Sequence, residues 1–324
     1  MSKTVQCELC PNACVLDINQ VSRCRTRINK DGTLYSLVYG KPCAVHIDPI
    51  EKKPFSHFLT GTTTFSIATA GCVLSCKFCQ NWQISQAKPE DTDTYDFPPD
   101  KVVTHAIFHK CRSISYTYTE PTVFYEYMYD TAVIARKRKI KNTIHSCGYI
   151  NEKPLRKLTK YMDAANIDLK GFSEDFYAKM CNGSLKPVLG SLVLLKKEDV
   201  WLEITNLVIP TLNDDMKQIR DMCRWIAKNL GADVPVHFSR FFPHYKLTNL
   251  PPTPVETLTE ARKTAIDAGL KFVYIGNIRH EAESTYCPEC KKMLIERTGY
   301  FVKQNNITNG KCKFCSASIP GIWS

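Results

Sequence analysis

The sequence predicts an α/β fold built around a parallel sheet, with a cysteine-rich part at each end. Between residues 63 and 280, short runs of β-branched and aromatic residues alternate with amphipathic stretches, a pattern typical of repeated βα units. Cysteines cluster before and after this region. We therefore expect three parts: an N-terminal cysteine-rich metal-binding segment (1–62), a βα domain (63–280) and a C-terminal zinc-ribbon-like module (281–324).

The βα domain is expected to contain seven strands with helices between them. The strands are predicted at residues 63–70, 113–118, 142–146, 164–169, 201–206, 236–240 and 272–276, and helices for example at 121–138, 214–229 and 254–268. Pro121 and Pro254 suit the first turn of a helix, and Gly269 suits the end of one. Six or seven βα units are too few for a closed eight-stranded barrel.

The composition excludes a membrane-spanning or disulfide-rich secreted protein. Hydrophobic residues make up 44% and charged residues 23% of the 324 residues, as in ordinary globular proteins. The longest apolar runs are too short for a membrane span, and the first residues form no apolar signal segment. Sixteen cysteines without such a signal indicate metal ligation in a reducing cytoplasm.

The net charge suggests one kind of partner. The formal charge of +11 falls to roughly +6 if one iron–sulfur cluster and two four-thiolate zinc sites are counted. Such an excess suits docking of an acidic electron carrier such as flavodoxin or ferredoxin, and it is weak support for nucleic-acid binding. The densest basic run, residues 136–141, falls where a helix should end, and cations there complement the helix dipole.

Three closely spaced cysteines follow the first predicted strand. Cys72, Cys76 and Cys79 supply three soft ligands, and no fourth cysteine lies near them in the sequence. A four-iron cluster ordinarily takes four thiolates, so three leave one iron open, much as a catalytic zinc keeps a free position. An open iron can bind and reduce a substrate. The competing interpretation is a zinc knuckle that borrows a distant fourth ligand.

This Cys-x3-Cys-x2-Cys pattern, with Phe78 before its last cysteine, resembles the signature of the radical S-adenosylmethionine (radical SAM) superfamily. Four further segments resemble the radical enzyme of the AmmeMemoRadiSam system, a relative of pyruvate formate-lyase activating enzymes: residues 48–55 (DPIEKKPF), 79–86 (CQNWQISQ), 167–170 (IDLK) and 239–243 (SRFFP). The resemblance implies a partial (β/α)6 barrel, a [4Fe–4S] cluster and S-adenosylmethionine bound to its open iron. It also implies reductive cleavage of that cofactor to a 5′-deoxyadenosyl radical, which abstracts hydrogen from a substrate.

The resemblance implies roles for residues at predicted strand ends. Glu120 falls where related enzymes carry Gly-Gly-Glu-Pro, so its carboxylate would hold the amino group of the cofactor, although Tyr118 and Thr119 replace the glycines. The competing role for Glu120 is that of a helix cap. Ser146 would hydrogen-bond the ribose or the carboxylate.

Asp168 and Lys170 share one face of their strand, because they are two residues apart. They would face the polar end of the cofactor or the substrate, and a plain exposed ion pair is the alternative. Phe78 would shield the cluster from water. Ile209 is placed to pack on adenine, and Arg240 to meet an anionic group.

Two further cysteine groups predict additional metal sites. The C-terminal pairs fit a structural zinc ribbon, with rubredoxin-type iron as the alternative; they are Cys287, Cys290, Cys312 and Cys315. The N-terminal group suits either zinc, which we slightly favour, or an auxiliary iron–sulfur cluster; it consists of Cys7, Cys10, Cys14 and Cys24.

The substrate is less well defined than the cofactor chemistry. Kinship with activating enzymes implies a protein or peptide substrate, such as the glycyl residue of a glycyl-radical enzyme. The AmmeMemoRadiSam resemblance instead implies a modification carried out with Memo-like and AMMECR-domain partners, and we rank it first. Alternatives of another class are a noncatalytic metal-binding scaffold and RNA modification, but the sequence has no aromatic-basic motif for RNA.

Overall fold

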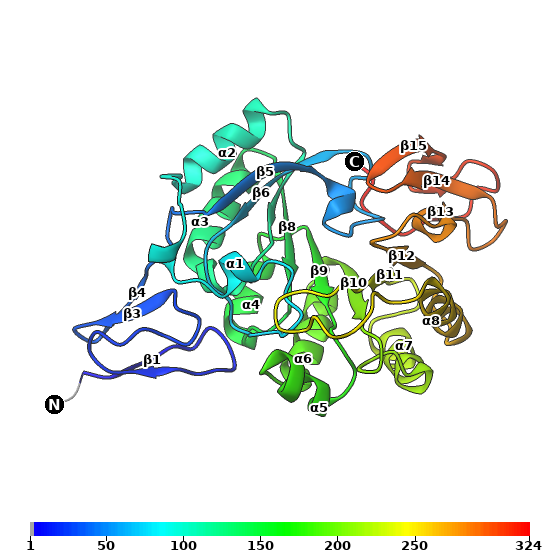
Figure 1. Ribbon diagram of the computed structural model, residues 1–324. Coiled ribbons are helices and arrows are strands. Elements are labelled where there is room, and N and C mark those ends of the chain that lie inside the picture. Colours follow the sequence, from blue (N-terminus) through cyan, green and yellow to red (C-terminus); the bar gives the residue numbers. More distant parts are fainter. Residues whose placement is uncertain (1–2) are drawn as a thin grey trace.

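The computed structural model describes residues 3–324 and has one eight-stranded sheet at its centre (Figure 1). The order of its strands is β12-β11-β10-β9-β8-β7-β6-β5. Their bounds are β5 (Ala44–Pro49), β6 (Thr63–Ala68), β7 (Ser113–Tyr116), β8 (Lys141–Ser146), β9 (Ala164–Asp168), β10 (Trp201–Val208), β11 (Val236–Arg240) and β12 (Val273–Gly276). Strands β6 to β12 are parallel, and β5 runs antiparallel to β6.

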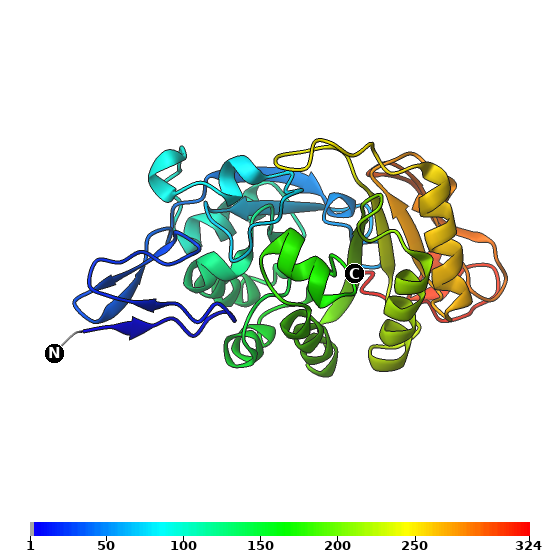
Figure 2. The same ribbon diagram turned by 60° about the horizontal axis from the view of Figure 1, so that its bottom comes forward.

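Helices connect the parallel strands and cover the outer face of the curved sheet (Figure 2). The six connecting helices are α2 (Pro99–Phe108), α3 (Tyr125–Lys137), α4 (Glu152–Thr159), α6 (Leu185–Lys197), α7 (Met216–Asn229) and α8 (Val255–Asp267). The shorter ones are α1 (Trp82–Ser85), α5 (Glu174–Phe176), the π-helix η4 (Tyr177–Cys181) and the 3-10 helices η1 (Ile50–Lys52), η2 (Pro89–Asp91), η3 (Pro121–Phe124) and η5 (Glu281–Glu283). The predicted α/β fold, an open barrel of six βα units and a last strand, is confirmed. None of the helices in residues 3–324 combines the length and the apolar character that a membrane span requires.

The helix ends follow from local chemistry. Asp215 precedes α7 and its carboxylate accepts a hydrogen bond from the backbone N–H of Gln218 at 2.8 Å, as a helix cap does. Pro254 is the cap of α8 and not its first residue. The predicted helix at 121–138 begins as the 3-10 turn η3 and becomes α-helical from Tyr125.

Strand β5 lies within the segment 1–62, for which we expected only a metal site. It pairs with β6 along its whole length, from Ala44 opposite Ala68 to Pro49 opposite Thr63. Strand β5 is an edge strand that ends in proline and exposes Ile47. Its apolar and polar residues alternate too weakly to predict a strand from the sequence. The sheet therefore begins at Ala44, before the expected boundary at residue 63, whereas the three-part division stays a prediction.

Small antiparallel elements form both ends of the chain and lie at opposite ends of the sheet (Figure 1). The N-terminal pairs are β1 (Val5–Gln6) with β2 (Val15–Leu16) and β3 (Arg27–Lys30) with β4 (Thr33–Ser36). The C-terminal strands are β13 (Thr285–Tyr286), β14 (Met293–Thr298), β15 (Phe301–Asn305), β16 (Ile307–Thr308) and β17 (Lys311–Cys312).

A buried carboxylate closes the end of the barrel where the strands begin. Glu203 of β10 accepts hydrogen bonds from the backbone N–H groups of Ser56 at 2.9 Å and His57 at 2.8 Å. His237 of β11 lies 2.7 Å from the same carboxylate. A buried charge needs such partners, so Glu203 fixes the segment after η1 against the sheet.

The imidazole of His57 joins this segment to the C-terminus. Its Nδ1 lies 2.6 Å from the carbonyl oxygen of Pro320, and its Nε2 lies 2.6 Å from the hydroxyl of Tyr274. A neutral ring satisfies both contacts, with Nδ1–H donating to the carbonyl and Nε2 accepting from Tyr274. Complete burial lowers the pKa of His57 to about 4.

We expect this histidine to make stability fall with decreasing pH. The unfolded chain gains a proton at His57 below about 6.5 and the folded chain only below about 4, so the unfolded state binds more protons between these values. The free energy of unfolding should therefore drop by about 2 kcal/mol from pH 7.5 to pH 5. Urea unfolding at several pH values measures this. His57→Gln should flatten the slope and exposed His244→Gln should keep it; equal slopes in both variants would contradict the assignment.

Candidate active site

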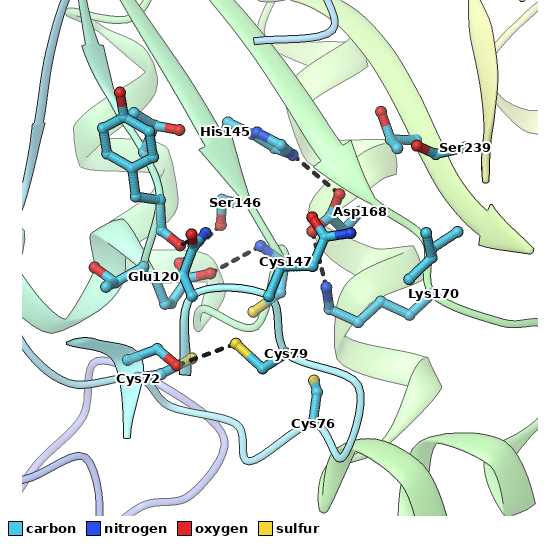
Figure 3. Close-up of a pocket in the computed structure, with 18 of the residues that line it drawn as sticks. Cys72, Cys76, Cys79, Glu120, His145, Ser146, Cys147, Asp168, Lys170 and Ser239 are labelled. Atoms are coloured by element: carbon cyan, nitrogen blue, oxygen red, sulfur yellow. Dashed lines mark hydrogen bonds and ion pairs between the residues drawn. The ribbon is translucent and has the colours of Figure 1, made fainter. Parts of the chain in front are cut away.

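A cavity of about 420 Å³ lies where the parallel strands end (Figure 3). Its size is that of a small-molecule site. Nine of the predicted site residues line it: Cys72, Cys76, Phe78, Cys79, Thr119, Glu120, Ser146, Asp168 and Lys170. They come from the ends of β6, β7, β8 and β9 and the loops that follow them, which is where α/β barrels place their chemistry.

The cysteine loop follows β6 and is held by backbone hydrogen bonds to η4. The N–H of Ser75 donates to the carbonyl of Cys181 at 3.0 Å, and that of Lys77 donates to Met180 at 2.9 Å. The Sγ of Cys79 lies 3.1 Å from the hydroxyl oxygen of Ser85. A π-helix is uncommon and often marks a functional site, and here it supports the loop.

The donor set of the loop fits a cluster with one open position. Cys72, Cys76 and Cys79 line the same cavity (Figure 3). A four-iron cluster ordinarily takes four thiolates, one on each iron. Three cysteine thiols that face one cavity can therefore hold a [4Fe–4S] cluster and leave one iron open.

Glu120 presents a fixed carboxylate to the cavity. Its Oε1 accepts from the N–H of Thr122 at 3.1 Å, the hydroxyl of Thr122 at 2.8 Å and the hydroxyl of Ser146 at 2.8 Å. Its Oε2 accepts from the N–H of Cys147 at 2.8 Å. Glu120 is thus the cap of η3 and also a wall of the cavity, so both predicted roles are compatible. Its position suits an ammonium group.

A charged group of three side chains forms the opposite wall. Asp168 lies between Lys170, at 2.8 Å from its Oδ2, and His145, at 3.0 Å from its Oδ1. Removal from water would raise the pKa of Asp168, but Lys170 and His145 together hold it below its usual range. Burial opposes the charge of Lys170, yet Asp168 raises the pKa of this amine well above its ordinary value. The pair is therefore ionised and faces the cavity, unlike an exposed surface pair.

The sequence analysis missed Lys52 and Lys53, which line this cavity and share one carboxylate partner. Asp48 at the end of β5 forms ion pairs with Lys53 at 2.7 Å and Lys52 at 2.9 Å, and it accepts a hydrogen bond from the hydroxyl of Tyr118. The amine of Lys53 lies 3.9 Å from the centre of the Tyr118 ring. Burial lowers the pKa of Lys53 to about 8 despite the nearby carboxylate. Segment 48–55 carried part of the resemblance, but the resemblance assigned no role to these side chains.

Two predicted residues lie outside this cavity. Ile209 is completely buried in the core, and its N–H donates to the side chain of Asn213 at 2.6 Å. The guanidinium of Arg240 donates to the carbonyl of Thr253 at 2.8 Å and lies 5.2 Å from the ring of Phe242. Neither is among the residues that line the cavity, so their contact with adenine or an anion stays a prediction.

The other two cysteine groups form separate sites. In the C-terminal module, the Sγ atoms of Cys287 and Cys315 are 3.6 Å apart and those of Cys290 and Cys312 are 3.8 Å apart. This matches the spacing of about 3.8 Å between thiolates that are each about 2.3 Å from one tetrahedral zinc, so this group could hold zinc. The N-terminal group lines a separate small cavity of about 10 Å³ beside the cysteine loop, and its members are Cys7, Cys10, Cys14 and Cys24.

Comparison with known proteins identifies the class. Residues 66–223 match the family model of the Radical SAM superfamily, and this range contains the cysteine loop, Glu120 and the Asp168–Lys170 pair. The chain is 46% identical over 318 residues to an uncharacterized protein of Methanocaldococcus jannaschii, covering 97% of this chain and 95% of that one. The chain therefore belongs to the Radical SAM superfamily, whose members are enzymes that bind a [4Fe–4S] cluster and S-adenosylmethionine.

More distant similarities support the same fold. The chain is 22% identical over 174 residues to a pyruvate formate-lyase-activating enzyme of Listeria monocytogenes, covering 50% of this chain and 68% of that enzyme. A radical SAM methyltransferase from Sphaerobacter thermophilus superposes with a TM-score of 0.51 at 12% identity, over 66% of this chain and 67% of that one. SuiB of Streptococcus suis, bound to its precursor peptide SuiA, gives 0.52 at 15% identity, over 69% of this chain and half of SuiB.

We expect Gly71→Ala to destabilise the protein and to lower its iron content. Gly71 has a φ of +93°, and a Cβ there would lie 2.4 Å from a methyl carbon of Thr26 and 2.5 Å from the carbonyl oxygen of Cys24. The backbone strain alone costs about 1–3 kcal/mol, and the contact with the carbonyl adds to it. Urea unfolding and iron analysis measure both effects.

Gly190→Ala is the matched control for this substitution. Gly190 lies in α6, and a Cβ there would have no atom within 4 Å. Alanine should stabilise that helix by about 0.5–1 kcal/mol. Equal stabilities of the two variants would mean that the close approach at Gly71 does not constrain the loop.

Proposed function

We propose that the protein reductively cleaves S-adenosylmethionine at a [4Fe–4S] cluster held by Cys72, Cys76 and Cys79. The bound cofactor would supply a 5′-deoxyadenosyl radical that abstracts hydrogen from a protein or peptide substrate. One observation carries this proposal: the three thiols share a cavity with Glu120 and the Asp168–Lys170 pair. Three protein ligands leave one iron free for the cofactor.

The residues of the cavity would bind and orient the cofactor. The four hydrogen bonds to Glu120 leave its carboxylate fixed, so it can accept from the cofactor's ammonium without rearranging. Lys170 places a cation beside the loop, with its amine 6.0 Å from the centre of the buried Phe78 ring. Asp168 holds that amine in place, and the carboxylate of a bound cofactor would be attracted to the same cation.

A second cavity supports a large substrate. It has a volume of about 510 Å³ and shares Thr205, Ser239 and Tyr300 with the first. Its lining includes residues of the barrel, such as His237, and of the C-terminal module, such as Arg297. A peptide segment could therefore extend from the reaction cavity toward that module. SuiB, which shares the fold, binds a precursor peptide.

The similarity to a pyruvate formate-lyase-activating enzyme supports activation of a glycyl-radical enzyme as a second candidate. We place a modification within the AmmeMemoRadiSam system first, with Memo-like and AMMECR-domain proteins as partners, because segments 48–55 and 79–86 contribute to the cavity. A flavodoxin or ferredoxin would supply the electron. The sixteen cysteines, none of them in a disulfide within residues 3–324, support a reducing cytoplasm as the location.

We expect anaerobically purified protein to cleave S-adenosylmethionine to 5′-deoxyadenosine and methionine when dithionite supplies the electron. Chromatography of the products measures this. Cys76→Ala should abolish cleavage, because the cluster loses one of its three protein ligands. An unreactive wild-type protein with an intact [4Fe–4S] spectrum would refute the enzymatic proposal and favour a noncatalytic scaffold.

We expect Asp168→Asn to retain its cluster and to lower the rate of cleavage at least about tenfold, since a neutral amide pairs far less strongly with Lys170 and His145. Asp175→Asn is the matched control, because Asp175 forms an exposed pair with Lys179 at 2.7 Å and such pairs contribute little. The ratio of cleavage rates at equal iron content is the measurement. Equal rates in both variants would show that the buried pair does not orient the cofactor.

A further inference from the structure

A segment from near the opposite edge of the sheet reaches the cysteine loop. Residues 241–254 connect β11 to α8 and extend across to the cysteine loop that follows β6 (Figure 2). The backbone N–H of Lys246 donates to the carbonyl of Lys77 at 2.9 Å. Lys77 stands between Cys76 and Cys79 in the sequence. The connection therefore lies directly beside the loop that carries the predicted cluster ligands.

This part of the surface lies outside the two large cavities. Lys77 and Lys246 are exposed, and neither of them lines the first or the second cavity. Cys76 is buried and lines the first cavity. The cysteine loop thus has one side toward the cavity and the other toward solvent. A second protein could approach a cluster from the solvent side without entering the cavity.

Two aromatic rings connect this lysine pair to α1. The ring of Tyr245 stacks on that of Trp82, with centroids 5.2 Å apart and 15° between the planes. The amine of Lys246 lies 5.2 Å from the centre of the Tyr245 ring, within the range of a cation–π contact. Trp82 keeps 38% of its surface exposed. Exposed aromatic side chains are enriched in protein–protein interfaces, so the stacked pair is suited to contact a partner.

A third cation lies at the other side of the loop. The guanidinium of Arg23 donates to the carbonyl of Asn182 at 2.7 Å. The side-chain amide of Asn182 in turn donates to the hydroxyl of Ser75 at 3.1 Å. Arg23 and Lys246 therefore flank the segment 75–77 of the cysteine loop.

The positive charge of this surface is not compensated. Arg23, Lys77 and Lys246 are all exposed, and none of them forms an ion pair with another of the residues 3–324. The carboxylate of Asp175, which precedes the supporting helix η4, is already paired with Lys179 at 2.7 Å. A cluster of unpaired cations attracts an acidic partner and steers its approach.

We propose that the solvent side of the cysteine loop docks an acidic one-electron carrier of the flavodoxin class. The docking surface consists of Arg23, Lys77, Lys246 and the stacked rings of Trp82 and Tyr245. The inference rests on the proposed function, since a cluster behind the loop is what requires an electron. The reduced carrier would lose one electron and the [4Fe–4S] cluster would gain it, and no covalent bond forms or breaks.

Binding of oxidised flavodoxin to the full-length, cluster-loaded protein tests the surface without turnover. Calorimetry should show that affinity falls as salt rises, because salt screens exposed charges. The double variant Arg23→Glu, Lys246→Glu should raise the Kd at low salt at least about tenfold. Lys263→Glu is the matched control, since Lys263 is an exposed lysine of α8 without an ion pair in the described chain; its Kd should stay within about twofold of the wild type.

The source of the electron separates docking from chemistry. Dithionite is a small ion that needs no docking surface, so the double variant should cleave S-adenosylmethionine with dithionite at the wild-type rate. With reduced flavodoxin its rate should fall at least about tenfold at low carrier concentration. If the double variant loses iron, Lys246→Glu alone provides the same comparison.

An unchanged Kd together with an unchanged flavodoxin-driven rate would overturn the proposal, and it is the result expected if this surface docks the substrate protein instead. A wild-type protein that binds flavodoxin here but cleaves nothing with dithionite would refute the proposed function and leave the docking surface intact. The two proposals can therefore fail separately.

Discussion

Backbone hydrogen bonds between neighbouring parallel strands fix the register of the sheet. The positions of the functional loops at the ends of these strands depend on this register. Ile67 of β6 is paired with Tyr116 of β7, which is paired with Ile144 of β8, and Ser146 is paired with Ile167 of β9. A shift of one residue in any pair would turn the following side chains to the opposite face of the sheet. The common register therefore brings the cysteine loop and the side chains that end β7, β8 and β9 to one cavity.

The lysines that line this cavity, and Asp168, have ion-pair partners before any cofactor binds. Asp168 is held by Lys170 and His145, and Asp48 by Lys53 and Lys52. A charge buried without a partner costs several kcal/mol, so these pairs keep the charges in fixed positions at low cost. A cofactor with both an ammonium and a carboxylate then meets groups that need little rearrangement. The N-terminal segment adds a further constraint, because it packs directly behind the loop that holds the thiols.

Much of this architecture could be predicted from local patterns. The seven parallel strands were expected within a few residues of their observed bounds, because alternating βα units carry a strong periodic signal. Strand β5 was missed, since an edge strand with exposed apolar residues lacks that signal. Nine predicted site residues line the cavity, because short motifs after strands carry chemistry directly. Ile209 and Arg240 do not, since the direction of a side chain beyond a strand end depends on the loop that follows.

The sequence by itself determined which thiols are grouped: three in the loop after β6, and two further sets of four cysteines. The spacing of the cysteines in the sequence is enough to define these sets. Only the tertiary structure decided that the sulfur atoms of Cys287, Cys290, Cys312 and Cys315 all lie within 4.8 Å of one another. It also decided that Lys53, paired with Asp48, reaches the cavity and that Cys24 lies against Gly71. These contacts join segments distant in sequence, and packing of the whole fold sets them, so no local pattern encodes them.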